Sequence, residues 1–485
     1  MISLSLLLLI LPLVFSVITG FLSGKNARAS AMAGALINLV VAGYAFTQFE
    51  ANTSYQFAFL SDWIPSIGAK FHIGIDGINL LLILLTNLLL PVIIYTVKHE
   101  DSNRSGLYYG LILFMQFALL GVFMALDALL YYIFWELALI PIYLILLGFS
   151  SLPDFKTFVK FFIYTLAGSL FMFIAILYVY IKAPGGNFSI DNFYNNHLSE
   201  QEQIWVFLGF FIAYAIKIPI IPFHTWQPDT YTKASTPGTM LLSGVMLKMG
   251  TFSLLRWLLP VAPLALATVT PVVIILCIIG IVYGSIIAIR QKNIKTLFAY
   301  SSLAHVGLIS AGVFALNADG FNGALIQMFN HGIIIVGLFL IAEIIYTRTE
   351  TYHISELGGI RNEAPTLAFT FLIIILASVA LPLTNGFVGE FLLLNGVFQY
   401  NQWMAVVGGT TVILSATYML RMYQRTMLGL DRDYTKTILD LGTVEKIMVL
   451  GLVLIIIVTG IWPSILLDPI KPAVENLLNI IKIVQ

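Results

Sequence analysis

The chain has 485 residues, of which 59% are hydrophobic and only 10% are charged, and its 24 basic and 24 acidic residues give a net charge of zero. A soluble globular domain has about 25% charged residues, so this composition excludes a soluble protein. The balanced charge also argues against a nucleic-acid partner. The single cysteine, Cys277, lies in an apolar run and can form neither an internal disulfide nor an iron–sulfur cluster by itself. Any redox chemistry therefore belongs to other chains.

The first apolar segment, residues 4–20, precedes the first basic residues, Lys25 and Arg28. A signal peptide carries its basic residues before the apolar stretch, so this order favours a retained first helix with the N-terminus outside. Apolar runs of 18 or more residues, each long enough to cross about 30 Å of hydrocarbon, recur along the chain.

The hydropathy pattern predicts an all-α polytopic membrane protein with about fourteen transmembrane helices. Their predicted centres lie near residues 12, 40, 86, 116, 138, 170, 214, 248, 280, 304, 333, 380, 412 and 457. Helices seven and twelve are predicted to be broken and five helices apart. Because five is odd, these features suggest two inverted five-helix repeats. We expect three N-terminal helices in residues 1–105, a first repeat in 106–262, a second in 263–430, and a loop, the last helix and a tail in 431–485.

The basic residues support this orientation, because loops on the inner side of a membrane are enriched in lysine and arginine. With the N-terminus outside, seventeen of the 24 basic residues would lie inside, including Lys98, Lys233, Lys292, Lys295 and Lys436. Five would lie on the outer side: Lys70, Lys182, Arg256, Lys471 and Lys482. The two remaining basic residues belong to neither side, because they fall within apolar segments: Lys217 and Lys248.

Six ionisable residues fall within predicted spans and are the candidate functional residues: Glu136, Lys217, Lys248, Glu390, His305 and His331. Charged side chains at this depth cost several kcal/mol each and normally face a protein interior or a water-filled cavity. Together they predict a proton relay. Burial disfavours the ammonium form of a lysine and a nearby carboxylate favours it, so movement of Glu136 relative to Lys217 would load or unload a proton.

Residues that break helices surround these charges: Pro141, Pro219, Pro222, Pro382 and Gly386. A proline inside a helix cannot donate to the carbonyl four residues earlier, and interrupted helices at membrane depth are tolerated only where they line protein or water. We expect these residues, with His224 near the inner mouth of helix seven, to act in helix breaks or gating.

Structural roles are the alternatives. Glu136 and Lys217 could form a static ion pair, Glu390 could cap a broken helix, and His305 and His331 could each satisfy a local carbonyl. Asp76, Asp127 and Asp229 are expected at helix ends, where capping is the ordinary role. No paired-histidine metal motif, P-loop or dinucleotide-binding glycine motif occurs in a suitable context.

Six motifs occur in order: FWELALIPIYLI, KIPIIPFHTWQPD, LLSGVMLKMGTFSLLR, NIKTLFAYSSLAHVGLI, ALIQMFNHGIIIVGLFL and NGFVGEFLLL. With them the chain resembles the antiporter-like subunits of respiratory complex I, most closely subunit M, from about residue 72 to residue 425. The resemblance implies a fourteen-helix fold in a bacterial inner membrane. It implies proton translocation driven by redox chemistry in partner subunits, which would hold NADH, FMN, iron–sulfur clusters and quinone. No cofactor is expected in this chain, and its expected partners are the other membrane-arm subunits, including neighbouring antiporter-like ones.

The resemblance also implies site roles. Glu136 matches the glutamate that pairs with the lysine of the broken seventh helix, here Lys217. Lys248 matches the central lysine of the eighth helix, and His305 and His331 match the family's buried histidines. Glu390 matches an acidic residue typical of subunit M, where sister subunits and cation/proton antiporters usually carry lysine.

The chain departs from the family in one loop. PDTYTKAST replaces the usual PDAHxxAPT, which puts Tyr231 in place of a histidine and adds Lys233. A subunit of a multi-subunit sodium/proton antiporter and a purely structural membrane subunit remain the alternatives.

Overall fold

The computed structural model describes residues 3–97, 104–150, 154–432, 435 and 438–484, so Lys98 and Lys436 lie outside the described residues. The chain divides into two units. Unit 1 comprises Met1–Pro219, Lys233–Val272 and Asp468–Gln485, and unit 2 comprises Ile220–Thr232 and Val273–Leu467.

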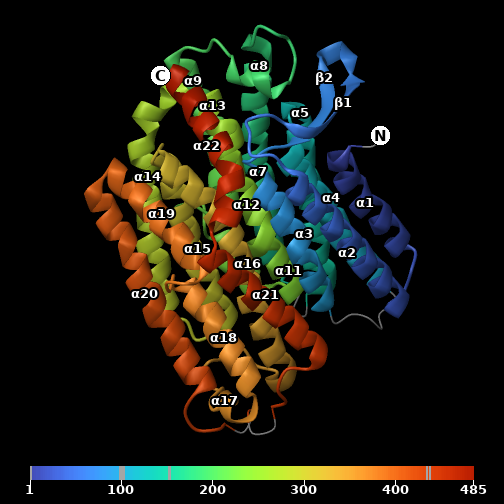
Figure 1. Cartoon of the computed structure of the whole chain (residues 1–485), viewed down its shortest axis with the longest axis vertical. Helices are drawn as coiled ribbons and strands as arrows, with labels where there is room; N and C mark the ends of the chain where they lie inside the picture. The colour runs from blue at the N-terminus through green and yellow to red at the C-terminus, as the bar shows by residue number, and fades with distance from the viewer. Residues whose placement is uncertain (1–2, 98–103, 151–153, 433–434, 436–437, 485) are drawn as a thin grey trace. The chain divides into compact units, whose positions relative to one another are not determined.

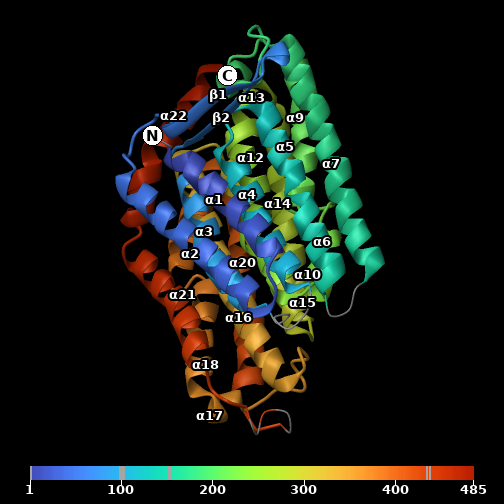
Figure 2. The ribbon, with the colours of Figure 1, turned by 90° about the vertical axis from the view of Figure 1, so that its right-hand side faces the viewer.

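Unit 1 begins with four apolar helices, which lie side by side in both views (Figures 1 and 2): α1 (Leu4–Gly20), α2 (Gly24–Gln48), α3 (Leu80–Tyr95) and α4 (Ser105–Met124). The hydroxyl of Ser3 accepts a hydrogen bond from the Leu6 amide and so caps α1. Inside the group, the Asn38 side-chain nitrogen donates to Asn87 Oδ1 at 2.8 Å, which links two buried side-chain amides of α2 and α3.

A two-stranded antiparallel hairpin, which the sequence analysis did not predict, separates α2 from α3. It consists of β1 (Gln56–Ile64), the 3-10 turn η1 (Pro65–Ile67) and β2 (Ala69–Ile75). Gly68 turns the chain with a φ of +68°, a conformation that glycine adopts at little cost. The Lys70 amide donates to Asp127 Oδ2 at 3.0 Å, which fastens the hairpin to the start of α5.

Five further helices of unit 1 carry or support the predicted charges: α5 (Ala128–Leu137), α6 (Leu139–Phe149), α7 (Phe155–Lys182), α8 (Ile190–Tyr194) and α9 (Glu200–Lys217). Asp127 caps α5 by accepting from the amides of Leu129 and Leu130, as expected. Helices α7 and α9 run alongside each other (Figure 2). Ser199 and Glu202 form a capping box at the start of α9.

The remaining helix of unit 1 alternates between α and π geometry. It consists of α11 (Thr236–Met240), the π segment η2 (Leu241–Met246), α12 (Leu247–Ser253), the π segment η3 (Leu254–Leu258) and α13 (Leu259–Val261), with the 3-10 turn η4 (Pro263–Ala265) after it. An apolar stretch of 18 residues within this helix is entirely buried. π-helical turns occur often at functional sites. The last helix, α22 (Ser464–Val484), contributes most of its length to unit 1.

Unit 2 is built almost entirely of helices: α10 (Trp226–Lys233), α14 (Leu266–Ile289), α15 (Ile294–Phe314), α16 (Ala318–Thr349), α17 (Ile360–Glu363), α18 (Pro365–Ser378), α19 (Asn385–Tyr400), α20 (Gln402–Met427) and α21 (Thr443–Ile461). The first residues of α14 and the last residue of α10 belong to unit 1. Helix α16 packs against α15, α18 and α19 and forms the centre of unit 2 (Figure 1).

Ten helical segments within the described residues are long and apolar enough to cross a membrane, and three shorter apolar helices accompany them: α1, α3 and α18. The protein is therefore a multi-pass helical membrane protein, as predicted. The total of fourteen spans remains a prediction. The break predicted near residue 380 is present, because α18 ends at Ser378 and α19 begins at Asn385.

Candidate functional site

Glu136 is the next-to-last residue of α5, in the helical segment that Pro141 interrupts. Helix α5 ends at Leu137 and α6 starts at Leu139, so a one-residue break at Ala138 lies two residues after Glu136. The side chains of Ser169 and Tyr132 hydrogen-bond to the Glu136 carboxyl group, and the charge of Lys217 acts on it. The carboxyl group is thus partly satisfied by neutral hydroxyls from α5 and α7.

Lys217 is the last residue of α9 and is 2% exposed. Pro219 follows and ends the helix there. The ammonium nitrogen lies 5.5 Å from the centre of the Trp135 ring. It forms no hydrogen bond with any other described residue. The structure therefore brings Glu136 and Lys217 close enough for their charges to interact, without a direct hydrogen bond between them.

Lys248 lies on α12, the short α segment between the two π segments, and its side chain is completely buried. Its Nζ donates to the main-chain oxygen of Ser243 at 2.6 Å. Ser243 belongs to η2, where the π geometry changes the usual pairing of carbonyl groups. The irregular backbone thus supplies a polar partner to a completely buried lysine.

A buried group of hydroxyls links the three helices that carry these charges. The Tyr131 hydroxyl on α5 donates to Ser253 Oγ on α12 at 2.7 Å and lies 3.1 Å from the Tyr214 hydroxyl on α9. All three side chains are fully buried. Unit 1 therefore contains a buried group of hydrogen-bonded hydroxyls on the same three helices as Glu136, Lys217 and Lys248.

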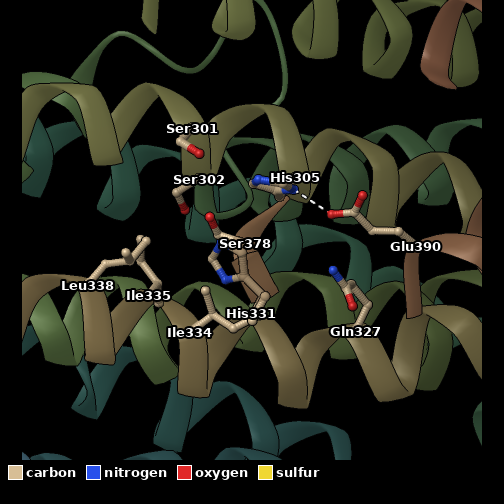
Figure 3. Close-up of a pocket in the computed structure, with 11 residues that line it drawn as sticks. Ser301, Ser302, His305, Gln327, His331, Ile334, Ile335, Leu338, Ser378 and Glu390 are labelled. Atoms are coloured by element: carbon tan, nitrogen blue, oxygen red, sulfur yellow. Dashed lines mark ion pairs between the residues drawn. The ribbon is translucent and has the colours of Figure 1, made fainter. Parts of the chain in front are cut away.

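In unit 2, His305 on α15, His331 on α16 and Glu390 on α19 come together (Figure 3). His305 Nδ1 lies 2.9 Å from Glu390 Oε1, and the two side chains point toward each other. The two imidazole rings have centres 6.1 Å apart. The three residues are 2–6% exposed, so an imidazolium at His305 would have the Glu390 carboxylate as its counter-ion.

These residues line a small enclosed cavity together with Ser301, Ser302, Gln327 and Ser378. The space that the centre of a water molecule can occupy is about 10 Å³. That is room for about one water, which needs two to four polar partners, and this lining offers them. The cavity can hold a proton carrier between two imidazoles and a carboxylate.

The predicted helix-break residues lie at two interruptions. Pro382 lies in the break between α18 and α19, and Gly386 is the second residue of α19, the helix that carries Glu390. Pro219 and Pro222 lie in the stretch between α9 and α10, and the His224 ring there contacts the Tyr283 ring edge-on at 5.0 Å. Gating by any of these residues remains a prediction.

The sequence analysis missed two buried charge groups. Arg256 was placed at an outer helix end, but it is 4% exposed and its guanidinium lies 2.5 Å from Asp76 Oδ1. Asp76 also accepts from the Ile78 and Asn79 amides, so its expected role at a helix end is present and the ion pair is an addition. Lys295 was placed in an inner loop, but it is 3% exposed and interacts with Glu343 and Tyr352.

The departure at Tyr231 and Lys233 has a structural explanation. Lys233 Nζ lies 2.5 Å from Asp154 Oδ2 and donates to the Thr157 hydroxyl at 3.0 Å, so the added charge fastens residue 233 to the start of α7. The hydrogen bond from Lys233 lowers the pKa of Asp154 from its usual value to about 2, so the Asp154 carboxylate stays ionised at neutral pH. Tyr231 is fully buried.

Across the residues that the structure describes, no group of three or more histidine, cysteine, aspartate or glutamate side chains could hold a metal ion. The arrangement of buried bases, acids and hydroxyls on interrupted helices is that of a membrane protein that moves protons or cations.

The family described as NADH:quinone oxidoreductase/Mrp antiporter, transmembrane, matches residues 125–415. NADH-quinone oxidoreductase subunit M of Rhodobacter capsulatus is 37% identical over 474 residues, which cover 95% of this chain and 92% of the relative. A chain of respiratory complex I from Thermus thermophilus superposes with a TM-score of 0.90 at 32% identity, over 99% of this chain and all of the other. A chain of the Mrp complex from a Dietzia species superposes with a TM-score of 0.84 at 19% identity. The superposition covers 98% of this chain and 97% of the Mrp chain, and it shows that the two have the same fold.

These matches identify the class as the antiporter-like membrane proteins. The chain belongs to the NADH:quinone oxidoreductase/Mrp antiporter family, and within it to the subunit M relatives.

Proposed function

We propose that this chain is a proton-translocating membrane-arm subunit of a complex I-type NADH:quinone oxidoreductase in a bacterial inner membrane. Its N-terminus lies on the outer side, and its residues 1–105, 106–262, 263–430 and 431–485 are the successive parts described above. The partners are the other membrane-arm subunits. NADH, FMN, iron–sulfur clusters and quinone belong to partner subunits, and this chain binds no cofactor.

The observation that carries this proposal is that two buried lysines, Lys217 and Lys248, and a half-buried glutamate, Glu136, lie within one unit, on helices that end or change geometry near each charge. Replacing charges by apolar side chains often leaves stability unchanged or increases it, so stability alone does not explain three of them. Their retention is explained if each takes up and releases a proton.

The geometry of Glu136 and Lys217 suits such a switch. Lys217 rests on the Trp135 ring and has no hydrogen bond to hold it among the described residues, so a small movement changes its distance from Glu136. A shorter distance favours the ammonium form and a longer distance favours the neutral amine. Redox energy from partner subunits would act by changing this distance, and Lys248, His305, His331 and Glu390 would carry the proton further.

The test is Glu136→Gln. This change keeps the size and most hydrogen bonds of the side chain but removes its charge. We expect NADH-driven proton pumping by this subunit to fall at least about tenfold with the subunit still assembled. Acidification of inverted membrane vesicles, measured per NADH oxidised, checks it. Glu202→Gln is the matched control, because Glu202 lies at the surface end of α9 beside Lys182.

Normal pumping in Glu136→Gln would contradict the proposal. The Mrp-type fold keeps a sodium/proton antiporter subunit as the second candidate. Sodium-driven proton movement in vesicles without NADH would favour that candidate. Unchanged pumping in assembled Lys248→Ala would favour a structural subunit.

A further inference from the structure

Lys295, Glu343 and Tyr352 form a buried charge group in unit 2 that the proposed relay does not use. Lys295 lies in the first turn of α15, and Glu343 lies near the end of α16; they are 3% and 8% exposed. The Tyr352 hydroxyl donates to Glu343 Oε2 at 2.9 Å, and Lys295 Nζ lies 5.5 Å from the centre of the Tyr352 ring. The charges of Lys295 and Glu343 interact. We name this set the Lys295 group.

The backbone fixes this group at one end of unit 2. The Ile294 amide donates to the Tyr352 carbonyl at 3.0 Å, and the Ile354 amide donates to the Lys292 carbonyl at 2.9 Å. These bonds pin the segment after α16 against the start of α15 and so hold Tyr352 over Lys295. Lys292 and His353, beside the group in sequence, are exposed. The group therefore lies just beneath the surface at the end of unit 2 where the basic residues gather.

The same two helices lead from the Lys295 group to the cavity at His305. On α15, Ser302 follows Lys295 by seven residues, about two helical turns, so it lies on the same face about 10 Å along the axis. His305 is three residues further. Figure 3 shows Ser301, Ser302 and Leu338 on the side of His305 away from Glu390, which is the direction in which Lys295 and Glu343 lie along their helices.

Hydroxyls continue the polar lining in that direction. Ser301 and Ser302 line the His305 cavity, and Ser301 Oγ lies 2.9 Å from the Tyr418 hydroxyl of α20. A hydroxyl can accept one proton while it donates another, and water bridges gaps that direct bonds do not span. Beside the group, the Tyr346 ring of α16 stacks on the Tyr352 ring.

We propose that the Lys295 group is the proton-uptake site of unit 2, which takes protons from water at the inner surface and supplies the His305–Glu390 cavity. In each turnover the pair of Lys295 and Glu343 accepts one proton from water and releases one toward Ser302, so it returns to its starting charge. The proton ends on an imidazole nitrogen of the cavity. This inference rests on the proposed function and its inner-side orientation.

The decisive variant is Lys295→Arg. Arginine keeps the cation and the contact with Tyr352, but a guanidinium does not release its proton in a protein. Exchange of protons therefore fails in Lys295→Arg, whereas a structural ion pair survives. We expect this subunit's share of the pumping per NADH to fall at least about tenfold in Lys295→Arg and in Glu343→Gln. Lys292→Met, at an exposed lysine three residues away, should pump normally.

Glu343→Asp gives a second readout, because it keeps a titratable carboxyl group while it shortens the side chain. Glu343→Asp should pump more than Glu343→Gln but less than the unchanged protein. The difference from the unchanged protein should grow from mildly acidic to mildly alkaline pH, because protons become scarce at the inner surface. A structural role predicts a deficit that does not change with pH.

Two results would overturn the inference: normal pumping in assembled Lys295→Arg, or pumping in Glu343→Gln equal to that of Lys292→Met. The proposed function would stand in both cases if Glu136→Gln still loses pumping. Normal pumping in Glu136→Gln would instead refute the proposed function, whatever the Lys295 variants do.

Discussion

Arg256 and Asp76 form an ion pair in the interior of unit 1, with their charged atoms 2.5 Å apart. Both side chains are almost fully buried, and the Tyr194 hydroxyl donates to the Arg256 carbonyl at 2.7 Å. Because Arg256→Met leaves the Asp76 carboxylate buried without its cation, we expect it to lower the free energy of unfolding by about 3–5 kcal/mol. Thermal unfolding of the purified complex, followed by loss of this subunit, measures the effect.

The double variant Asp76→Asn with Arg256→Met is the control for this prediction. It removes both charges, so it should recover most of the lost stability. Equal losses in the single and double variants would show that packing of the arginine, and not its charge, is what matters.

At the scale of residues, hydropathy identified the charges deepest in apolar runs but not those near helix ends. Glu136, Lys217 and Lys248 are each surrounded in sequence by apolar residues. Lys295 follows Arg290 and Lys292, so the local pattern indicated a basic loop. Arg256 and Asp76 are 180 positions apart, and no local signal joins them. The spacing of Lys295, Ser302 and His305 on one helical face was the available clue.

At the scale of elements, the break between α18 and α19 depends on the close approach of Gly386 to the preceding helix. A Cβ at Gly386 would lie 2.0 Å from the Ala377 carbonyl oxygen, a main-chain atom that cannot easily move. We expect Gly386→Ala to cost about 1–3 kcal/mol in stability and to reduce pumping, because the displaced helix carries Glu390. Thermal unfolding and vesicle acidification check the two effects.

Gly451 provides the matched control, since nothing lies within 4 Å of a Cβ added there on α21. Gly451→Ala should be neutral, or stabilising by about 0.5–1 kcal/mol through helix propensity. If Gly386→Ala unfolds and pumps like Gly451→Ala, the backbone at the break adapts, and Gly386 has no special role.

The elements were predictable where one signal dominated. Long apolar runs located the spanning helices, and Pro382 with Gly386 located the break near residue 380. The β1–β2 hairpin was not predicted, because its strands are short alternating segments and not long apolar runs. Pro65 and Gly68 between two such segments are nevertheless typical of a hairpin. The π segments around Lys248 have no sequence signal that we recognise.

At the scale of the whole molecule, each unit has its own group of interior charges. Unit 1 has the half-buried Glu136 with the buried Lys217 and Lys248, and unit 2 has His305, His331 and Glu390 with the Lys295 group. With only 10% charged residues in the chain, this concentration inside both units is the main departure from an ordinary apolar bundle. It raises the question of whether the two interiors act in series or independently.

The double variant Glu136→Gln with Glu390→Gln answers this question. If the two interiors act in one coupled cycle, in which the proton supplied through the Lys295 group leaves Glu390 only when the charges of unit 1 change, each single change removes the subunit's whole share of pumping. The double change then removes no more, because residues that act as a unit are not additive. This is the result that we expect. Two independent paths would instead give partial losses that add in the double variant. The number of protons moved per NADH in inverted vesicles distinguishes the outcomes, with Glu202→Gln in each background as the surface control. Additive losses would divide the proposed relay into two, one in each unit.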